Sequence, residues 1–455
     1  MTDTILKRSA RVSLTWQVAT LAGPLVLQNL SQTLLGVVDT FFVSRISTDS
    51  VAAVGLASVM FFAVLMLFRS TANSTVVFVG RAHGERDDAK VGQAVWRSLN
   101  MIGWLSLIVL VLPFLFSAVM SVAAPDDGSA VRELGTRYLQ IRAFEIPLVM
   151  FSAVVWGFLV GRGDSRTPMI LAWITVLLNI GLDWLLVPGN LGFPRLGVAG
   201  AAYATVMANG VNALLSGAIL WSRRNRRVYR TAVPQLARWP ELRQLLWVGL
   251  PLGLGDFIEI ASFSLFFALL ARLGTEVLAA NQIALQFMSL SFTFGVAINM
   301  AASSLVAQYL GAKRPDLAEK AAYRAVVVAM IGMGLIGLSY LIAPELLMGI
   351  FSDDPRVIEA GVTILRLVAL YQIFDAIGIV LAGALNGAGD TRFTMWGRIL
   401  LAWGLFIPLT WVILFRLDGG VWGAWFSALV YLTTLALLYL FRFRAGRWKQ
   451  IDLSL

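Results

Sequence analysis

Long apolar segments recur along the whole chain and are separated by short polar connections. A helix that spans a bilayer needs about 20 mainly apolar residues, and the chain contains twelve segments of roughly that length or more. They cover residues 14–43, 50–80, 91–122, 130–161, 167–188, 196–221, 241–271, 276–309, 317–349, 356–386, 393–415 and 420–443. This pattern predicts an all-α integral membrane protein with twelve transmembrane helices.

Two glycine-rich stretches, after the fourth and tenth spans, are near copies of one another. GFLVGRGDSRTPM begins at Gly157 and GALNGAGDTRFTM begins at Gly383. At almost the same separation along the chain, Pro24 of the first span matches Pro251 of the seventh. Each half holds six spans and starts on the same side, which predicts two six-helix bundles related by a parallel internal repeat.

The longest polar connection divides the chain near its midpoint. It covers residues 222–243 and is rich in arginine. We expect an N-terminal bundle at residues 1–221, a basic linker at 222–243, and a C-terminal bundle at 244–455.

The composition agrees with a membrane protein and excludes other classes. Hydrophobic residues make up 58% of the chain and charged residues 14%, whereas soluble domains are about 25% charged. The net charge of +10 comes from arginine and lysine between the spans, so it indicates membrane topology and not nucleic-acid binding. The chain has no cysteine and no phosphate-binding GxxxxGK[ST] loop, so we expect no thiolate metal site and no ATP hydrolysis.

Most basic residues lie in the terminal segments and in every second loop, beginning with Lys7, Arg8 and Arg11. By the positive-inside rule this places both termini in the cytoplasm. We expect a multi-pass protein of the cytoplasmic (inner) membrane, surrounded by lipids and monomeric.

The first span carries a single carboxylate, Asp39. Gly36, Gln32 and Gln28 precede it at helical spacing, so small and polar residues share one face of this helix. An ionisable residue inside a membrane is costly, which makes it a functional-site hypothesis by default. In the register that matches Pro24 with Pro251, Asp39 aligns with Phe266, so the two halves differ at this position.

Spans five and six carry further polar stripes. Thr175, Asn179 and Asp183 are spaced by four residues, and Thr205 and Asn209 begin a similar series in span six. Two carboxylates that face one cavity suit a site that binds and releases protons. A sodium ion would also accept the oxygens of Asp39, Asn179, Asp183 and Thr205, so the residue types leave the choice of ion open. We expect no cofactor and no resident metal.

Other charges also lie within the spans. Arg142 and Glu145 are three residues apart with Tyr138 on the same face, and we expect them and Arg69 to form structural or gating ion pairs. In the second half, a second acidic pocket that could take a cationic substrate is predicted from Asp256, Glu259, Gln282 and Asp375.

Several stretches together resemble the multidrug and toxic compound extrusion (MATE) family across essentially the whole chain. They include LAGPLVLQNLSQTLLGVVDTFFV, LLNIGLDWLLVPG, VGLPLGLGDFIEIASF and FDAIGIVLAGALNGAGDTR. The FRST and LNIGLD stretches look most like the DinF-like branch, which is named for a DNA-damage-inducible membrane protein.

This resemblance implies a secondary antiporter that exports small amphipathic, mostly cationic compounds in exchange for protons, by alternating access between inward-open and outward-open states. It implies that Asp39 takes up the coupling ion with Asn179, Asp183, Thr205 and Tyr138 as partners, and that the first helix bends at Pro24. The alternatives are a sodium-coupled exporter, a lipid-linked oligosaccharide flippase, and a non-transporting membrane receptor or scaffold. We do not expect an enzyme.

Overall fold

The computed structural model describes residues 13–123 and 130–453, and the regular structure of these residues is helical throughout. Eleven helices within them are long and apolar enough to span a membrane, and a twelfth span results if the bent pair α5 and α6 is counted as one. The prediction of an all-α membrane protein is therefore confirmed. Lys7, Arg8 and Arg11, on which the topology prediction partly rests, lie outside the described residues.

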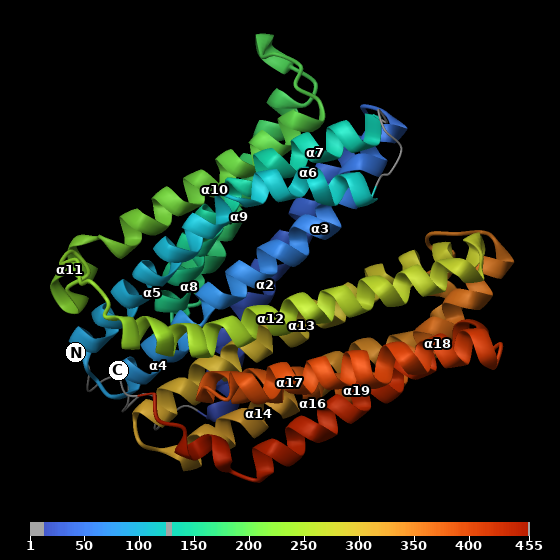
Figure 1. The fold of residues 1–455 in the computed structure, drawn as a ribbon. Coiled ribbons are helices and arrows are strands. Elements are labelled where there is room, and N and C mark those ends of the chain that lie inside the picture. The colour runs from blue at the N-terminus through green and yellow to red at the C-terminus, as the bar shows by residue number, and fades with distance from the viewer. Residues whose placement is uncertain (1–12, 124–129, 454–455) are drawn as a thin grey trace. The chain divides into compact units, whose positions relative to one another are not determined.

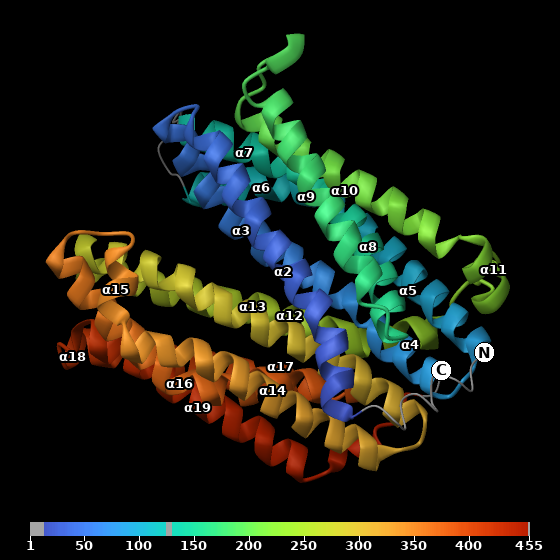
Figure 2. The same ribbon diagram turned by 180° about the vertical axis from the view of Figure 1, so that it is seen from behind.

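The chain divides into two compact units, which we treat separately. The N-unit comprises residues 27–253, and the C-unit comprises the described residues up to 26 together with residues 254–453. In each unit the helices run side by side as a bundle (Figures 1 and 2).

The helices of the N-unit pack around α8, which contacts α3, α4, α5, α9 and α10. Their bounds are α3 (Thr48–Asn73), α4 (Thr75–Gly84), α5 (Asp88–Val109), α6 (Leu112–Ala123), α7 (Ala130–Ala143), α8 (Glu145–Gly161), α9 (Arg166–Leu186), η1 (Asn190–Gly192), α10 (Val198–Leu220) and α11 (Arg223–Tyr229).

In the C-unit, α16 occupies the corresponding central place and contacts α13, α14, α17 and α19. The bounds are η2 (Ala271–Leu273), α13 (Thr275–Gly311), α14 (Pro315–Ile342), α15 (Pro344–Gly349), α16 (Pro355–Ala388), α17 (Thr391–Leu401), the π-helical turn η3 (Ala402–Phe406), α18 (Ile407–Arg416), α19 (Gly420–Arg444) and η4 (Arg447–Gln450).

Two long helices run through the division between the units. These are α2 (Leu14–Ser44), divided between residues 26 and 27, and α12 (Trp239–Leu270), divided between residues 253 and 254. Each division falls shortly after a proline inside the helix, Pro24 in α2 and Pro251 in α12. Because proline removes a backbone donor, it weakens the helix in the turn that precedes it.

Among the spans expected to be continuous helices, the third, fourth and ninth are broken close to a proline. The third ends at Val109 and resumes at Leu112 with a bend of 47°, because Pro113 cannot donate a backbone hydrogen bond there. The fourth breaks at Phe144, where Pro147 lacks the donor that would reach back one turn. The ninth stops at Ile342, since Pro344 begins a separate short helix.

The linker after α10 is fastened to the N-unit through Thr231. Its hydroxyl donates to the carbonyl of Leu220 at 2.7 Å, and its own carbonyl accepts the indole N–H of both Trp96 and Trp221 at 3.2 Å. Arg97 of α5 forms a 2.7 Å ion pair with Glu241 at the start of α12. The basic segment at 222–243 thus makes defined contacts with this unit.

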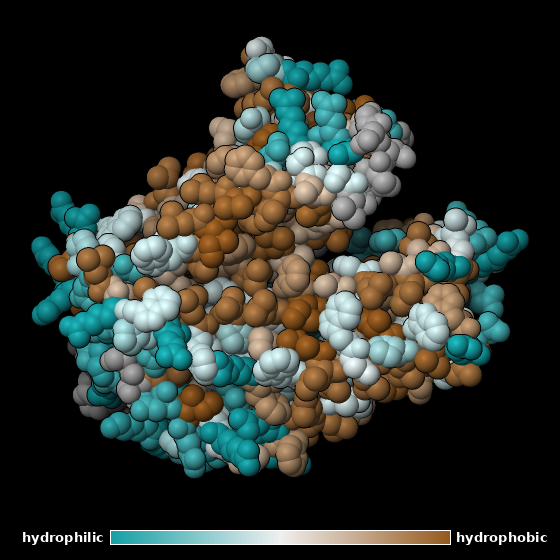
Figure 3. All heavy atoms as spheres, in the orientation of Figure 1, coloured by the Kyte–Doolittle hydropathy of each residue, from teal (hydrophilic) through white to brown (hydrophobic). Residues whose placement is uncertain are grey.

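Apolar side chains cover the long sides of the helices, and hydrophilic side chains gather towards the helix ends (Figure 3). Exposed side chains such as Trp104, Leu214 and Phe441 belong to this apolar surface. In a soluble protein so large an exposed apolar area would be unusual, but it is expected where the surrounding solvent is lipid.

Paired glycines let the central helix of each unit approach its neighbour closely. A Cβ at Gly161 of α8 would lie 2.9 Å from the Val79 side chain, and one at Gly387 of α16 would lie 2.2 Å from the carbonyl oxygen of Ser303. Gly161 and Gly387 are equivalent positions of the repeat, so the two bundles share this contact. Small residues at helix contacts are characteristic of membrane proteins.

Replacement of Gly387 by alanine is expected to destabilise the protein by about 1–3 kcal/mol, because the added methyl group meets backbone atoms that cannot rotate away. The measurement is thermal unfolding in detergent micelles. Gly334→Ala in α14 is the matched control, since a Cβ there has no neighbour within 4 Å. Equal unfolding midpoints for the two variants would refute the close contact.

Candidate functional site

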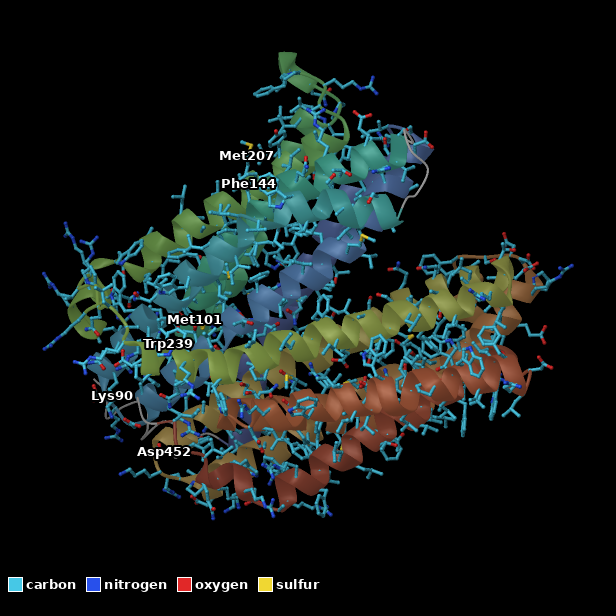
Figure 4. All side chains as sticks on the ribbon, viewed as in Figure 1. Lys90, Met101, Phe144, Met207, Trp239 and Asp452 are labelled. Atoms are coloured by element: carbon cyan, nitrogen blue, oxygen red, sulfur yellow. The ribbon has the colours of Figure 1, made fainter. Side chains whose placement is uncertain are left out.

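The polar residues predicted in the first half come from four helices of the N-unit. Asp39 lies on α2, Tyr138 on α7, Asn179 and Asp183 one turn apart on α9, and Thr205 on α10. All five side chains are buried. Met207, two residues after Thr205, is half exposed on the outer face of α10 (Figure 4), so the helix turns its polar position inward.

Asp39, Thr205 and Asn179 form a connected group, which with Asp183 we call the Asp39 cluster. The Thr205 hydroxyl lies 3.4 Å from Oδ2 of Asp39 and 2.9 Å from the carbonyl of Ala201, either of which can accept its proton. The Asn179 amide donates to the same hydroxyl at 3.5 Å. Asp183 lies close enough to Asp39 for the two carboxyl groups to interact.

The Asp39 cluster contains more acceptors than donors. Four buried oxygens accept no hydrogen bond of normal geometry from any described residue: Oδ1 of Asp39, Oδ1 of Asn179 and both carboxyl oxygens of Asp183. A buried acceptor without a partner costs about 1–3 kcal/mol, and more when it is charged. These oxygens can therefore accept protons or coordinate a small cation.

A second polar group adjoins this cluster. Arg142 forms a 2.5 Å ion pair with Glu145 and donates to the Tyr138 hydroxyl at 2.7 Å. Asn209 donates to Glu145 at 3.1 Å and to the backbone carbonyl of Thr205 at 3.0 Å. Asn209 thus links the ion pair to the Asp39 cluster.

The ion pair bridges the break in its helix. Phe144 interrupts the regular structure between Arg142 and Glu145, and these two residues are still about one helical turn apart along the chain. Phe144 itself is exposed (Figure 4). Arg69, the other basic residue expected in an ion pair, is half-buried on α3.

The acidic residues predicted in the second half are gathered around a residue that was not expected. Asp256 and Glu259 of α12 both contact the guanidinium group of Arg398 on α17, with 3.2 Å between Arg398 Nη1 and Glu259 Oε2. Asp375 on α16 is half-buried and close enough to Glu259 for their charges to interact. Gln282 is exposed on α13.

Arg398 is detectable in the sequence by the criterion that selects Asp39. It is a single charge deep in an apolar span, and in the register that pairs Gly157 with Gly383 it aligns with Ala172. A charge that one half of the repeat carries and the other half lacks therefore marks a candidate functional residue, whichever half carries it.

The position equivalent to Asp39 has a different environment in the C-unit. Phe266 is fully buried there among Phe263, Phe406 and Trp425, with ring centroids 5.0 Å from Phe406 and 5.4 Å from Trp425. An aromatic core thus replaces the acidic cluster, so the two units share a scaffold and differ in polarity at this place.

One known family model matches each half of the chain separately. The MatE family model matches residues 24–185 and again residues 251–412. The two matches begin at Pro24 and Pro251, the prolines that the repeat pairs, which confirms the internal repeat predicted from the sequence.

Relatives of similar length are found in several bacteria. The chain is 28% identical to a probable multidrug resistance protein NorM of Thermotoga maritima, over 94% of this chain and 92% of that protein. It is 30% identical to the multidrug resistance protein PmpM of Pseudomonas aeruginosa, over 94% of this chain and 90% of that protein.

Solved structures share the fold. A MATE protein crystallised in a straight conformation matches with a TM-score of 0.85 at 22% identity, over 97% of this chain and 98% of that one. The eukaryotic MATE transporter AtDTX14 matches with a TM-score of 0.85 at 19% identity, over 96% of this chain and 97% of that one.

Proposed function

The chain belongs to the MatE family of multidrug and toxic compound extrusion transporters, and from this premise we propose that it exports amphipathic, mostly cationic compounds in exchange for protons by alternating access. The family consists of transporters, so the chain is not an enzyme. The names of the bacterial relatives, multidrug resistance proteins, support drug-like substrates.

The observation that carries the proposed coupling is the set of four buried oxygens without donors in the Asp39 cluster. Asp39 and Asp183 take up protons there, and their release accompanies substrate binding. Asn179 and Thr205 orient the two carboxyl groups, while Tyr138 holds the neighbouring Arg142. In the cluster around Arg398, the excess of carboxylates over guanidinium favours cationic compounds.

The bundles at residues 1–221 and 244–455, joined by the linker at 222–243, act as the two halves of the transporter, with Pro24 as the point where α2 bends. We propose cytoplasmic termini, a monomeric state, and a place in the DinF-like branch on the FRST and LNIGLD stretches. The curated relatives reported above carry the NorM and PmpM names, so the branch remains a prediction.

Sodium coupling is the second candidate, because the same four oxygens suit a small hard cation. Among the described residues no group of three or more histidine, cysteine, aspartate or glutamate side chains is arranged to hold a metal ion. A sodium site would therefore combine Asp39 and Asp183 with the neutral oxygens of Asn179 and Thr205. An oligosaccharide flippase is less well supported, since it needs several basic groups for a pyrophosphate and Arg142 is already paired with Glu145.

Purified protein in lipid vesicles, loaded with ethidium, tests the proposal. An inwardly directed proton gradient at constant sodium is expected to drive ethidium against its own gradient, and a sodium gradient at fixed pH is expected to have no such effect. Export driven by a sodium gradient alone would show that sodium, and not the proton, is the coupling ion. Transport with neither gradient, or none at all, would reject coupled export.

A further inference from the structure

The carboxylates of Asp256 and Glu259 already have a cation of their own. Nη1 of Arg398 contacts a carboxyl oxygen of each, and the Arg398 side chain is 15% exposed, compared with 37% for Asp256 and 29% for Glu259. The guanidinium is thus the most deeply placed member of the group, which we call the Arg398 triad. It stays charged at any pH the protein meets.

The fold holds Arg398 firmly in this position. The Tyr439 hydroxyl of α19 donates to the backbone carbonyl of Thr394 at 2.9 Å, one turn before Arg398. After Arg398, the chain widens into the π-helical turn η3, whose last residue Phe406 stacks on Tyr431 with 5.0 Å between ring centroids. Such π-helical turns occur often at functional sites.

The charges of the triad sum to a single negative charge when both carboxyl groups are ionised. Without Arg398, the same place would hold two half-buried carboxylates, with Asp375 of α16 near by. Two such groups need a counter-ion, and a small cation from solution would supply it. Arg398 does this from within the chain.

We infer that Arg398 is a resident counter-cation that sets the charge selectivity of the C-unit: it keeps sodium and other small cations away from Asp256 and Glu259 and leaves one negative charge for a cationic substrate. The substrate part of this inference rests on the proposed export function, whereas the exclusion of sodium does not. Arg398 is therefore a specificity-determining residue and not part of the ion-coupling cluster.

Binding of radioactive sodium to purified protein in lipid nanodiscs tests the inference without any transport. The wild type is compared with Arg398→Gln, Arg398→Lys and the double variant Glu259→Gln/Arg398→Gln. Arg398→Gln is expected to bind sodium with an affinity roughly tenfold or more above that of the wild type, because one nearby positive charge is removed. The lysine variant keeps the charge and is expected to behave as the wild type, and the double variant is expected to lose the gain.

Arg416→Gln is the matched control, because it removes an exposed arginine from α18 in the same span. Sodium bound at the Asp39 cluster would be common to all variants and cancel in the comparison. An Arg398→Gln variant that binds no more sodium than wild type, or whose gain persists in the double variant, overturns the inference.

A further variant keeps the test decisive if Arg398→Gln does not fold. Asp256→Asn leaves a neutral pair of Arg398 and Glu259, so ethidium binding measured by fluorescence is expected to weaken about tenfold, while binding of an uncharged substrate is unchanged. Equal loss for charged and uncharged compounds would contradict a role in charge selectivity. Failure of vesicle transport would instead concern the proposed function alone.

Discussion

Asp39→Asn is expected to reduce proton-driven ethidium export by at least about a hundredfold, the lower end of what a positioned proton-transfer group contributes. The substitution keeps the size of the side chain and removes the acid. Asp39 is buried, and its hydrogen bond with Thr205 is long at 3.4 Å, so the fold is not expected to depend on it. Initial rates in vesicles with a defined pH gradient measure the effect.

Asp49→Asn is the matched control for this prediction, because Asp49 is an exposed aspartate in the first turn of the next helix, α3. It is expected to export at the wild-type rate. If Asp39→Asn also exports at that rate, Asp39 does not couple the ion. Asp183→Asn is expected to resemble Asp39→Asn, and the double variant to be no worse than either, since the two carboxyl groups act as one unit.

The second large effect concerns stability. Glu145→Gln and Arg142→Gln are each expected to destabilise the protein by about 3–5 kcal/mol, because each leaves the other charge buried without its partner. The side chains are 3% and 11% exposed, respectively. The double variant is expected to recover much of this loss, since both charges are then gone. Thermal unfolding in detergent micelles, followed by tryptophan fluorescence, measures the differences.

An exposed pair provides the control for these variants. Arg366 and Glu345 lie 3.0 Å apart with more than half of each side chain exposed, so Glu345→Gln is expected to change stability by less than about 1 kcal/mol. A double variant Arg142→Gln/Glu145→Gln as unstable as the sum of its parts would show that the two residues act through separate contacts and not as a pair.

The spans, the repeat and part of the Asp39 cluster can be predicted from the sequence, and particular residues show why. Spans are recognisable because lipid requires long apolar helices, and the repeat follows from the shared glycines, such as Gly161 and Gly387, that sit at equivalent close contacts. Asn179 and Asp183 fall on one face because helical spacing puts residues four apart on the same side.

Other features depend on contacts between distant segments, and spacing along the chain does not reveal those. Asn209 joins Glu145 to the Asp39 cluster across two helices. Arg398 meets Asp256 and Glu259 from a helix that lies far along the chain. The break at Phe144, by contrast, leaves a signal in the sequence, because Pro147 lacks the backbone donor that would reach back one turn.

The most direct test of the central claim is proton release on substrate binding, measured with purified protein in weakly buffered detergent solution at constant sodium. If the Asp39 cluster exchanges protons for substrate, ethidium releases protons from the wild type and from Asp49→Asn, and releases none from Asp39→Asn or Asp183→Asn. Release from Asp39→Asn equal to that of the wild type would contradict the account.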